Sequence, residues 1–489
     1  MLKATRRSAV LLAIVAIGML AVSMPSFAEV QNIKVGGDET VRAFWRSNLD
    51  LQDEAQNVNP SPAGTGTGLT LNSHDYFLQN TLGININANL TENVEVEARI
   101  ANERTLGTTG TANGDIDISR ANVKLKDIFY SPFTLTLGTF PVRWGRGLVL
   151  GSNLIPSILE TGDDRNQSID ANEFTDFTAF DGAELKGEFG GTAAMSMPLN
   201  LDLVYLKTHE GVVGKGDDTN LMGANIGTRF DKGEAEVYYL NKREGAYGTV
   251  GSSIGHKGSV STMGVRGSAK PTDGSNVYGE VAYQFGLRAT DPSAFALPKG
   301  DAQQAWAANL GADVTLADVA TKPMLGAEWI FFSGKNSKAC PTTSCGGVPG
   351  WDPIAKGYFT TALRDFQTSS GVAGFYSPSQ AGVTGGQTNQ HDLSLYGSFK
   401  PLEDLTIAPR LSWFFLANGI RPIAPNGTAQ AKRSSYVGME WDTVATYNYT
   451  DDVQFGLIYG LFAPGNIYLG AHGLDSTAQE LVSSVSVKF

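Results

Sequence analysis

The chain has 489 residues, of which 42% are hydrophobic and only 18% are charged, and it contains 57 glycines. Soluble domains average about 25% charged residues and about 7% glycine, so charge is scarce here and glycine is abundant. The formal net charge of -12 argues against a nucleic-acid binder, because such proteins normally present a basic face. After residue 28 the sequence has no apolar run of the roughly 20 residues that a membrane helix needs, which excludes a helical membrane protein.

The N-terminus has the features of a secretory signal peptide. Lys3, Arg6 and Arg7 form a basic start, residues 9–22 are apolar, and a cleavage site with small residues ends at Ala28. We therefore expect residues 1–28 to be removed and residues 29–489 to work outside the cytoplasm. A retained membrane anchor is the weaker alternative, because the apolar stretch is short and the cleavage site follows at once.

The chain has two cysteines, Cys340 and Cys345, in a polar stretch. Such a pair usually forms a disulfide in the oxidising environment that an exported chain meets. In the chain-entropy model, so small a loop contributes roughly 2 kcal/mol, which would fix a local turn rather than the fold. The sequence lacks further metal ligands near this pair and a C-x-x-C-H haem motif, so we expect no metal and no cofactor.

Short segments of alternating apolar and polar residues recur along the chain. Over residues 82–90, leucine, isoleucine and alanine take the even positions, whereas glycine and asparagine take the odd ones. After a tight turn at 91–93, residues 94–101 continue the apolar face, with glutamate and arginine on the other face. About 18 such segments fit the strand length of a transmembrane barrel. Further examples are residues 120–125, 277–284, 405–411 and 453–459.

The lengths of the connections support an all-β, antiparallel, up-and-down barrel in the outer membrane. Such barrels alternate short periplasmic turns with long extracellular loops. Short connections are expected at 91–93, 127–133, 231–233, 271–275 and 400–404, with 188–198 longer than its class. Long ones are expected at 50–75, 147–174, 287–303, 335–390 and 417–436.

Aromatic residues cluster where strands meet the long loops, which predicts an outer interface girdle. The chain ends on an alternating strand closed by Phe489, which is similar to the C-terminal signature that the barrel-assembly machinery reads. A secreted soluble β-sandwich would show similar alternation, but not this combination of features. The residues expected in the girdle are Phe44, Trp45, Tyr238, Tyr239, Trp329, Phe331, Phe332, Trp413, Phe414, Phe415 and Phe462.

A barrel of this size encloses water, because side chains cannot fill so wide a lumen. Charged residues on the inward face would then set solute selectivity through their local field. The alternative is that arginines and glutamates on neighbouring strands pair and merely stiffen the wall. Alternation places inward the residues Arg42, Arg46, Arg99, Arg120, Lys124, Arg229, Arg266, Arg410, Glu95, Glu97, Glu236, Glu280, Glu328, Glu440 and Asp442.

One strand stands apart, because residues 135–151 break their alternation at Pro141 and then place Arg143 and Arg146 beside glycines. This segment resembles the alginate-export family of outer-membrane barrels. The resemblance implies an 18-stranded barrel with an arginine-rich pore for an anionic uronate polymer. It makes Arg143 and Arg146 pore cations, with Arg120 and Lys124 close by. The likeness extends to residues 36–37, 76–81, 180–183, 438–442 and 462–465.

Taken together, the sequence predicts an outer-membrane porin that passes hydrophilic, anionic solutes or an anionic polysaccharide. Alternatives are a barrel that acts as a sheath for a periplasmic electron-transfer partner, or an adhesin. We expect no enzyme, because neither a Gly-x-Ser-x-Gly elbow nor an H-E-x-x-H motif is present. Outer-membrane lipid and lipopolysaccharide are the expected partners. The loops 147–174 and 335–390 fold into the pore or extend into solvent, and the sequence leaves both possibilities open.

Overall fold

The fold is known from a computed structural model. It describes residues 32–49, 51, 74–107, 116–151, 174–190, 197–209, 218–245, 257–288, 302–334, 350–355, 357–364, 388–420, 434–469 and 476–489. The predicted signal peptide and the cysteine pair Cys340 and Cys345 lie outside these residues.

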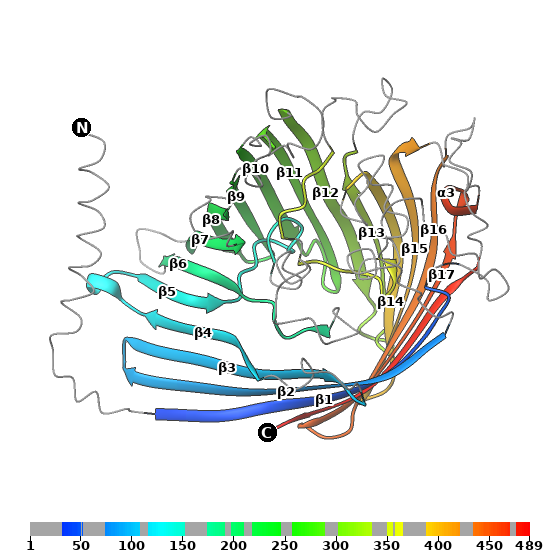
Figure 1. The fold of residues 1–489 in the computed structure, drawn as a ribbon, viewed down its shortest axis with the longest axis horizontal. Helices are drawn as coiled ribbons and strands as arrows, with labels where there is room; N and C mark the ends of the chain where they lie inside the picture. The colour runs from blue at the N-terminus through cyan, green and yellow to red at the C-terminus, as the bar shows by residue number, and fades with distance from the viewer. Residues whose placement is uncertain are drawn as a thin grey trace, which may run out of the picture.

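Over the described residues, eighteen strands form one antiparallel sheet, and each strand pairs with its neighbours in the sequence (Figure 1). The strands are β1 (Asn32–Ser47), β2 (His74–Thr91), β3 (Val94–Thr105), β4 (Asp117–Leu125), β5 (Phe133–Phe140), β6 (Phe180–Phe189), β7 (Leu199–His209), β8 (Thr219–Phe230), β9 (Gly233–Glu244), β10 (Gly258–Ala269), β11 (Ser275–Leu287), β12 (Ala302–Thr315), β13 (Met324–Phe332), β14 (Gln390–Leu402), β15 (Leu405–Ile420), β16 (Ser434–Asn448), β17 (Val453–Pro464) and β18 (Ala478–Lys488).

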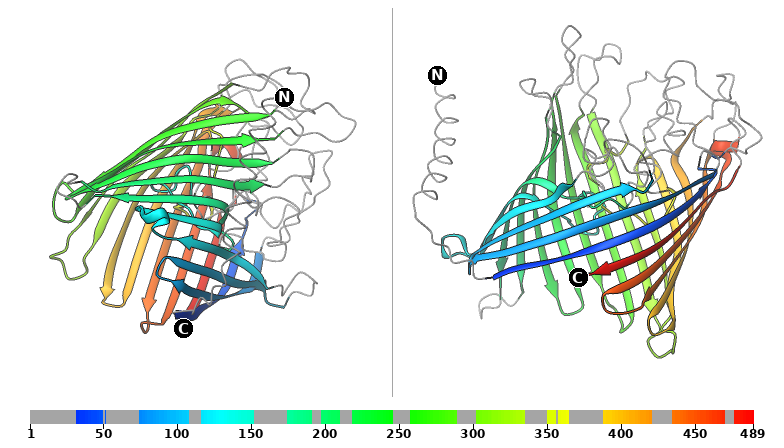
Figure 2. Two further views of the ribbon diagram at one scale, coloured as in Figure 1. Left: turned by 90° about the vertical axis from the view of Figure 1, so that its left-hand side faces the viewer. Right: turned by 60° about the horizontal axis from the view of Figure 1, so that its bottom comes forward.

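The sheet closes on itself between the first and last strands. β1 pairs with both β2 and β18, with Val41 opposite Val485 at the closing seam. At the end of the seam, the amide of Gly37 donates to the carbonyl of Phe489 at 2.7 Å, and the amide of Phe489 donates to the carbonyl of Gly37 at 3.0 Å. Figure 2 shows the blue first strand beside the red last strand. The predicted all-β barrel is therefore confirmed.

The two faces of the wall differ as the alternation predicts. Val265 and Val281 oppose each other on β10 and β11 and expose 54% and 36% of their surface on the outside. The next pair of the ladder, Arg266 and Glu280, is on the inside. Successive residues of a strand point to opposite faces, so a single register sets an apolar outer wall and a polar inner one.

The girdle prediction is wrong for about half of its residues. Phe44, Tyr238, Phe332, Phe414 and Phe462 point inward and are buried. Most of the predicted girdle residues come as adjacent pairs, and adjacent residues on a strand cannot share a face. Trp45 and Tyr239, which follow two of these residues, are exposed on the outside. The lumen therefore contains apolar clusters that the sequence analysis did not predict.

The connections follow the predicted alternation. Short turns at 92–93, 231–232 and 403–404 join β2 to β3, β8 to β9 and β14 to β15. The described helical segments are the 3-10 turn Ile128–Tyr130 and α3 (Asn466–Leu469). Among the described residues, the structure contains no helix with the length and apolar character to cross a membrane.

The closing seam gives a first testable prediction, through Gly37. A Cβ atom there would lie 2.5 Å from the carbonyl oxygen of Gly83 and 2.8 Å from the ring of Phe489. Gly37→Val should therefore destabilise the closed barrel by about 1–3 kcal/mol, the usual cost of overpacking. The measurement is the temperature at which the unheated, fast-migrating form is lost on denaturing gels. Gly227→Ala is the control, because the nearest neighbour of its Cβ would be the Cγ atom of the Glu236 side chain, at 3.3 Å, and not a backbone atom. An equal loss of thermal stability in both variants would contradict the prediction.

Candidate functional site

Two segments leave the long connections and pack against each other inside the barrel. Residues 141–151 follow β5, and residues 350–355 and 357–364 belong to the connection between β13 and β14. Leu150 and Ala355 form a parallel bridge, and the amide of Gly357 donates to the carbonyl of Gly147 at 2.8 Å. Figure 1 shows the two segments, in cyan and yellow, within the ring of strands. The described parts of loops 147–174 and 335–390 thus fold inward; we call the pair of segments the inner partition.

The first segment is anchored by a tryptophan. β5 ends at Phe140, because Pro141 cannot donate to the strand ladder. Trp144 is 2% exposed, and its indole N–H donates to Asp202 on β7 at 2.8 Å. Burying a large apolar side chain contributes roughly 1.5–3 kcal/mol, so this anchor offsets part of the entropy lost on folding the segment inward. It joins an apolar cluster with Leu148, and both contribute to one continuous core with residues of the barrel wall.

Wall carboxylates hold the backbone of the same segment. The amide of Gly145 donates to Glu236 at 3.0 Å, and the amide of Arg146 donates to Glu280 at 2.9 Å. Glu280 also accepts a hydrogen bond from the hydroxyl of Tyr238 at 2.7 Å. Gly145 has a φ of 58°, and a Cβ there would lie 2.6 Å from a Glu280 oxygen. Both the left-handed conformation and the close approach of Glu280 therefore favour glycine at this position.

The side chain of Arg146 enters a cluster centred on Glu328. Its guanidinium lies 3.5 Å from one oxygen of Glu328, donates to the hydroxyl of Tyr358 at 2.7 Å and stacks 3.7 Å from the ring centre of Tyr278. Arg410 approaches the other oxygen of Glu328 at 3.2 Å. Glu328 is 4% exposed, so its carboxylate forms ion pairs with two guanidinium groups at a place shielded from bulk water. We call these residues the Glu328 cluster.

The environment fixes the protonation of the two members contributed by the inner partition. Burial disfavours the charged guanidinium of Arg146, but Tyr358, Tyr278 and Glu328 outweigh this and raise its pKa above the usual value. Burial raises the pKa of Tyr358, and the neighbouring negative charge of Glu328 raises it further. Arg146 is therefore charged and Tyr358 neutral at every physiological pH.

The second segment is held in the same manner. Lys242 on β9 pairs with Asp352 at 3.3 Å. On β16, Glu440 accepts hydrogen bonds from the amides of Leu363 at 2.6 Å and Arg364 at 2.9 Å. Glu440 is fully buried beneath this backbone. It was predicted to line the pore; it points inward, but its contacts are with the inner partition.

A third inward segment, 174–179, precedes β6. Arg99 on β3 pairs with Asp176 at 2.7 Å and with Asp38 on β1 at 2.8 Å. Arg42 lies 4.8 Å above the ring centre of Phe174 and donates to Gln79 and Thr81. Arg99 and Arg42, two of the predicted pore arginines, thus hold the connection between β5 and β6 against the wall.

The remaining predicted cations divide into paired and unpaired groups. Lys124 pairs with Glu97 at 3.1 Å, and Arg266 pairs with Glu234 and Glu236, each at 2.5 Å. The Nε atom of Arg120 has no hydrogen-bond partner among the described residues. Lys124 contacts β3 whereas Arg146 reaches β11 and β13, so these two cations have different partners among the described residues.

Arg143 differs from the other predicted cations of the inner partition. It is exposed, and its guanidinium donates to the backbone carbonyl of Arg146 at 2.5 Å. Among the described residues no carboxylate lies within ion-pair distance of it. This contact shares a neutral oxygen and leaves the positive charge uncompensated. Within the described residues, moreover, no group of three or more histidine, cysteine, aspartate or glutamate residues could hold a metal ion.

Sequence reasoning missed the aromatic members of the site. Tyr278 lies two residues before Glu280 on β11, and the alternation of residues 277–284 put both on one face but gave Tyr278 no role in the site. Tyr358 and Trp144 lie in irregular segments, where periodicity carries no information about direction.

A closed barrel of eighteen antiparallel strands, with an apolar outer wall and a charged interior, is the architecture of an outer-membrane channel. Residues 48–481 match the family model described as alginate export, so the chain belongs to the alginate export family. The chain is therefore a bacterial outer-membrane barrel that sits in lipid and passes hydrophilic solutes. Members of the family are channels, which confirms the prediction that the protein is not an enzyme.

Solved structures of outer-membrane proteins are similar to the chain over most of its length. Pseudomonas aeruginosa OpdQ is 12% identical, with a TM-score of 0.49, over 94% of this chain and 98% of that one. Pseudomonas aeruginosa OccK5 (OpdH) is 12% identical, with a TM-score of 0.46, over 93% and 98%. Acinetobacter baumannii OccAB2 is 13% identical, with a TM-score of 0.47, over 95% and 99%. No curated protein sequence matches the chain.

Proposed function

We propose that the channel passes small, hydrophilic, anionic solutes passively, and that Arg143 supplies the selectivity. The single observation behind this proposal is the exposed guanidinium of Arg143 on the inner partition, without a carboxylate partner among the described residues. An uncompensated charge inside a low-dielectric wall acts on a passing ion more strongly than a paired one. The cations of the Glu328 cluster, by contrast, share a carboxylate.

The size of the solute is the second part of the proposal. The inner partition joins segments from two long connections and is held by carboxylates of β9, β11 and β16. The inner partition occupies part of the lumen and so narrows the passage, which favours small solutes. Passage of an anionic polysaccharide is the second candidate, and the name of the family supports it. A sheath or adhesin function would leave the purified protein without conductance.

The selectivity proposal predicts the effect of Arg143→Ala. Removal of this charge should lower the ratio of anion to cation permeability by several-fold, because counter-ions are no longer concentrated at the partition. The measurement is the reversal potential in planar bilayers under a salt gradient. Arg143→Lys keeps the charge and should retain the ratio of the unmodified protein. An unchanged ratio in Arg143→Ala would refute the role of Arg143, and the absence of conductance in the unmodified protein would refute the channel itself.

We also propose that Phe489 is read by the barrel-assembly machinery. Its backbone closes the seam with Gly37, whereas its side chain is exposed. An exposed terminal ring at the seam is available to another protein while the last strand is being paired.

A further inference from the structure

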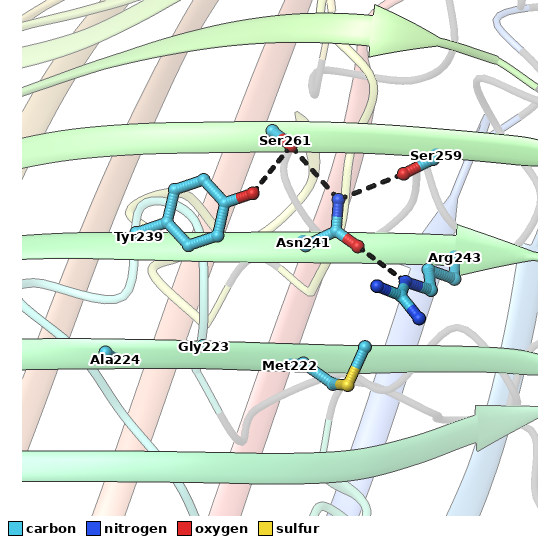
Figure 3. Close-up of a pocket in the computed structure, with 8 residues that line it drawn as sticks. All are labelled: Met222, Gly223, Ala224, Tyr239, Asn241, Arg243, Ser259 and Ser261. Carbon is cyan, nitrogen blue, oxygen red and sulfur yellow. Dashed lines mark hydrogen bonds between the residues drawn. The ribbon is translucent and has the colours of Figure 1, made fainter.

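A polar hollow lies on the outer wall of the barrel, across β8, β9 and β10. It has a volume of about 450 Å³. Figure 3 shows the residues that line it. The polar ones come from β9 and β10, and small or flexible residues of β8 form the opposite side. The lining consists of Met222, Gly223, Ala224, Tyr239, Asn241, Arg243, Ser259 and Ser261.

The direction of the strand residues shows that the hollow faces away from the lumen. On β9, Tyr238 and Lys242 contact Glu280 and Asp352 inside the barrel. Tyr239, Asn241 and Arg243 alternate with them and therefore point outward. Below this level the outer wall is apolar, as Val237 and Val265 show. Polar groups on a lipid-facing wall are costly at the centre of a bilayer, and less so near its interface.

The hydrogen bonds within the hollow orient the guanidinium of Arg243. The amide nitrogen of Asn241 donates to Ser259 at 3.1 Å and to Ser261 at 3.0 Å. The amide oxygen of Asn241 accepts from the Nε atom of Arg243 at 3.0 Å. Two further N–H-bearing nitrogens of this guanidinium have no partner among the described residues, and Arg243 is exposed. The cation is thus held in place with its fork toward the outside.

The depth of Arg243 identifies the chemistry that it meets. Tyr239 is exposed on the outer wall, and aromatic rings there mark the interface of the membrane. Arg243 lies four residues nearer the outer end of β9, about 13 Å along the strand at roughly 3.3 Å per residue. Strands in such barrels tilt by about 35–45°, so the rise along the membrane normal is about 10 Å. That is the level of the phosphorylated headgroups of the outer leaflet, beyond the acyl chains.

We propose that this hollow binds the phosphorylated sugar headgroup of an outer-leaflet glycolipid, with Arg243 on the phosphate. Guanidinium binds phosphate through two parallel hydrogen bonds, and the charges are complementary. The exposed Ser259 lies beside the sugar, and Met222 and Tyr239 lie against the start of the acyl chains. The site is separate from the lumen, so it is independent of what the channel transports.

The test uses the full-length protein, refolded in detergent free of lipopolysaccharide. Native mass spectrometry measures its binding of bisphosphorylated lipid A, of dephosphorylated lipid A and of inorganic phosphate. Arg243→Gln should weaken binding of the bisphosphorylated lipid about tenfold or more, which corresponds to about 1.4 kcal/mol. The matched control is Arg104→Gln, at an exposed arginine that alternates with the inward Glu103 near the outer end of β3. It should bind lipid A as the unmodified protein does.

Several results would overturn the proposal. Equal affinity for the two forms of lipid A would remove the role of the phosphate. If inorganic phosphate bound in an Arg243-dependent manner and with the same affinity as lipid A, the ligand would be free phosphate and not a glycolipid. A stable oligomer that shields the hollow would make a second copy of the chain the occupant; cross-linking through Ser259→Cys detects it. If the Arg243 and Arg104 variants lost affinity for lipid A equally, the loss would come from general surface charge and not from the hollow.

Discussion

Glu328→Gln should raise the anion preference of the channel by several-fold, the opposite of the effect expected for Arg143→Ala. Glutamine keeps the volume of the side chain and removes the charge that Arg146 and Arg410 share. Breaking a buried pair in this way costs about 3–5 kcal/mol, because the remaining charge is left uncompensated. We expect the two arginines to reach toward water in the lumen, where they attract anions. Reversal potentials in planar bilayers measure the change.

The control for this experiment is Glu403→Gln, which removes the same charge from the exposed turn between β14 and β15. A charge in solvent is screened within about 8–10 Å at ordinary salt, so this variant should keep the selectivity of the unmodified protein. If Glu328→Gln shifted the preference toward cations, or left it unchanged, the Glu328 cluster would have no part in selectivity. The thermal stability of the barrel separates a local change in the cluster from general unfolding.

Gly151→Val should widen the passage and increase single-channel conductance. A Cβ at Gly151 would lie 2.6 Å from the Cα of Gly357, so the two segments of the inner partition can touch only without side chains there. Valine forces them apart at a cost of about 1–3 kcal/mol. The bridge between Leu150 and Ala355 lies next to this contact and should be lost with it. Uptake of neutral sugars of increasing size into proteoliposomes provides a second measurement.

The control for this variant is Gly267→Ala on β10, where a Cβ would have its nearest neighbour at 3.7 Å, the carbonyl oxygen of Glu234. It should leave conductance unchanged. A Gly151→Val channel with the conductance and size limit of the unmodified protein would show that the inner partition does not define the passage.

The wall of the barrel could be predicted from the sequence, because one physical rule determines it. Lipid on one side and water on the other impose a period of two, so the even positions of residues 82–90 predicted the outer face directly. The same rule placed Arg266, Glu280 and Glu328 inside, where the structure has them. The girdle prediction did not follow this rule, because it assigned adjacent aromatic residues to one face.

The inner partition could not be predicted from the sequence, because no periodicity governs its segments. Trp144 and Tyr358 take their positions from partners that are distant in sequence, Asp202 and Glu328. The arginine-bearing segment was singled out by its broken alternation at Pro141 and by its likeness to a family. The structure places this segment inside the barrel, and the role of its arginines as pore cations stays a prediction. Their pairing was not predicted, since the choice between a free cation and an ion pair depends on which carboxylate the fold brings near. Arg143 and Arg146, three residues apart, differ in this respect.

The manner in which the inner partition is docked has a consequence for how such a pore diversifies. Glu236, Glu280 and Glu440 bind amides of the polypeptide backbone, which every amino acid except proline supplies. The side chains of the docked segments can therefore change in evolution, while the same carboxylates of the wall still bind the backbone of these segments. One barrel can thus hold different inner segments, each with its own solute selectivity, without a change in the wall that binds them.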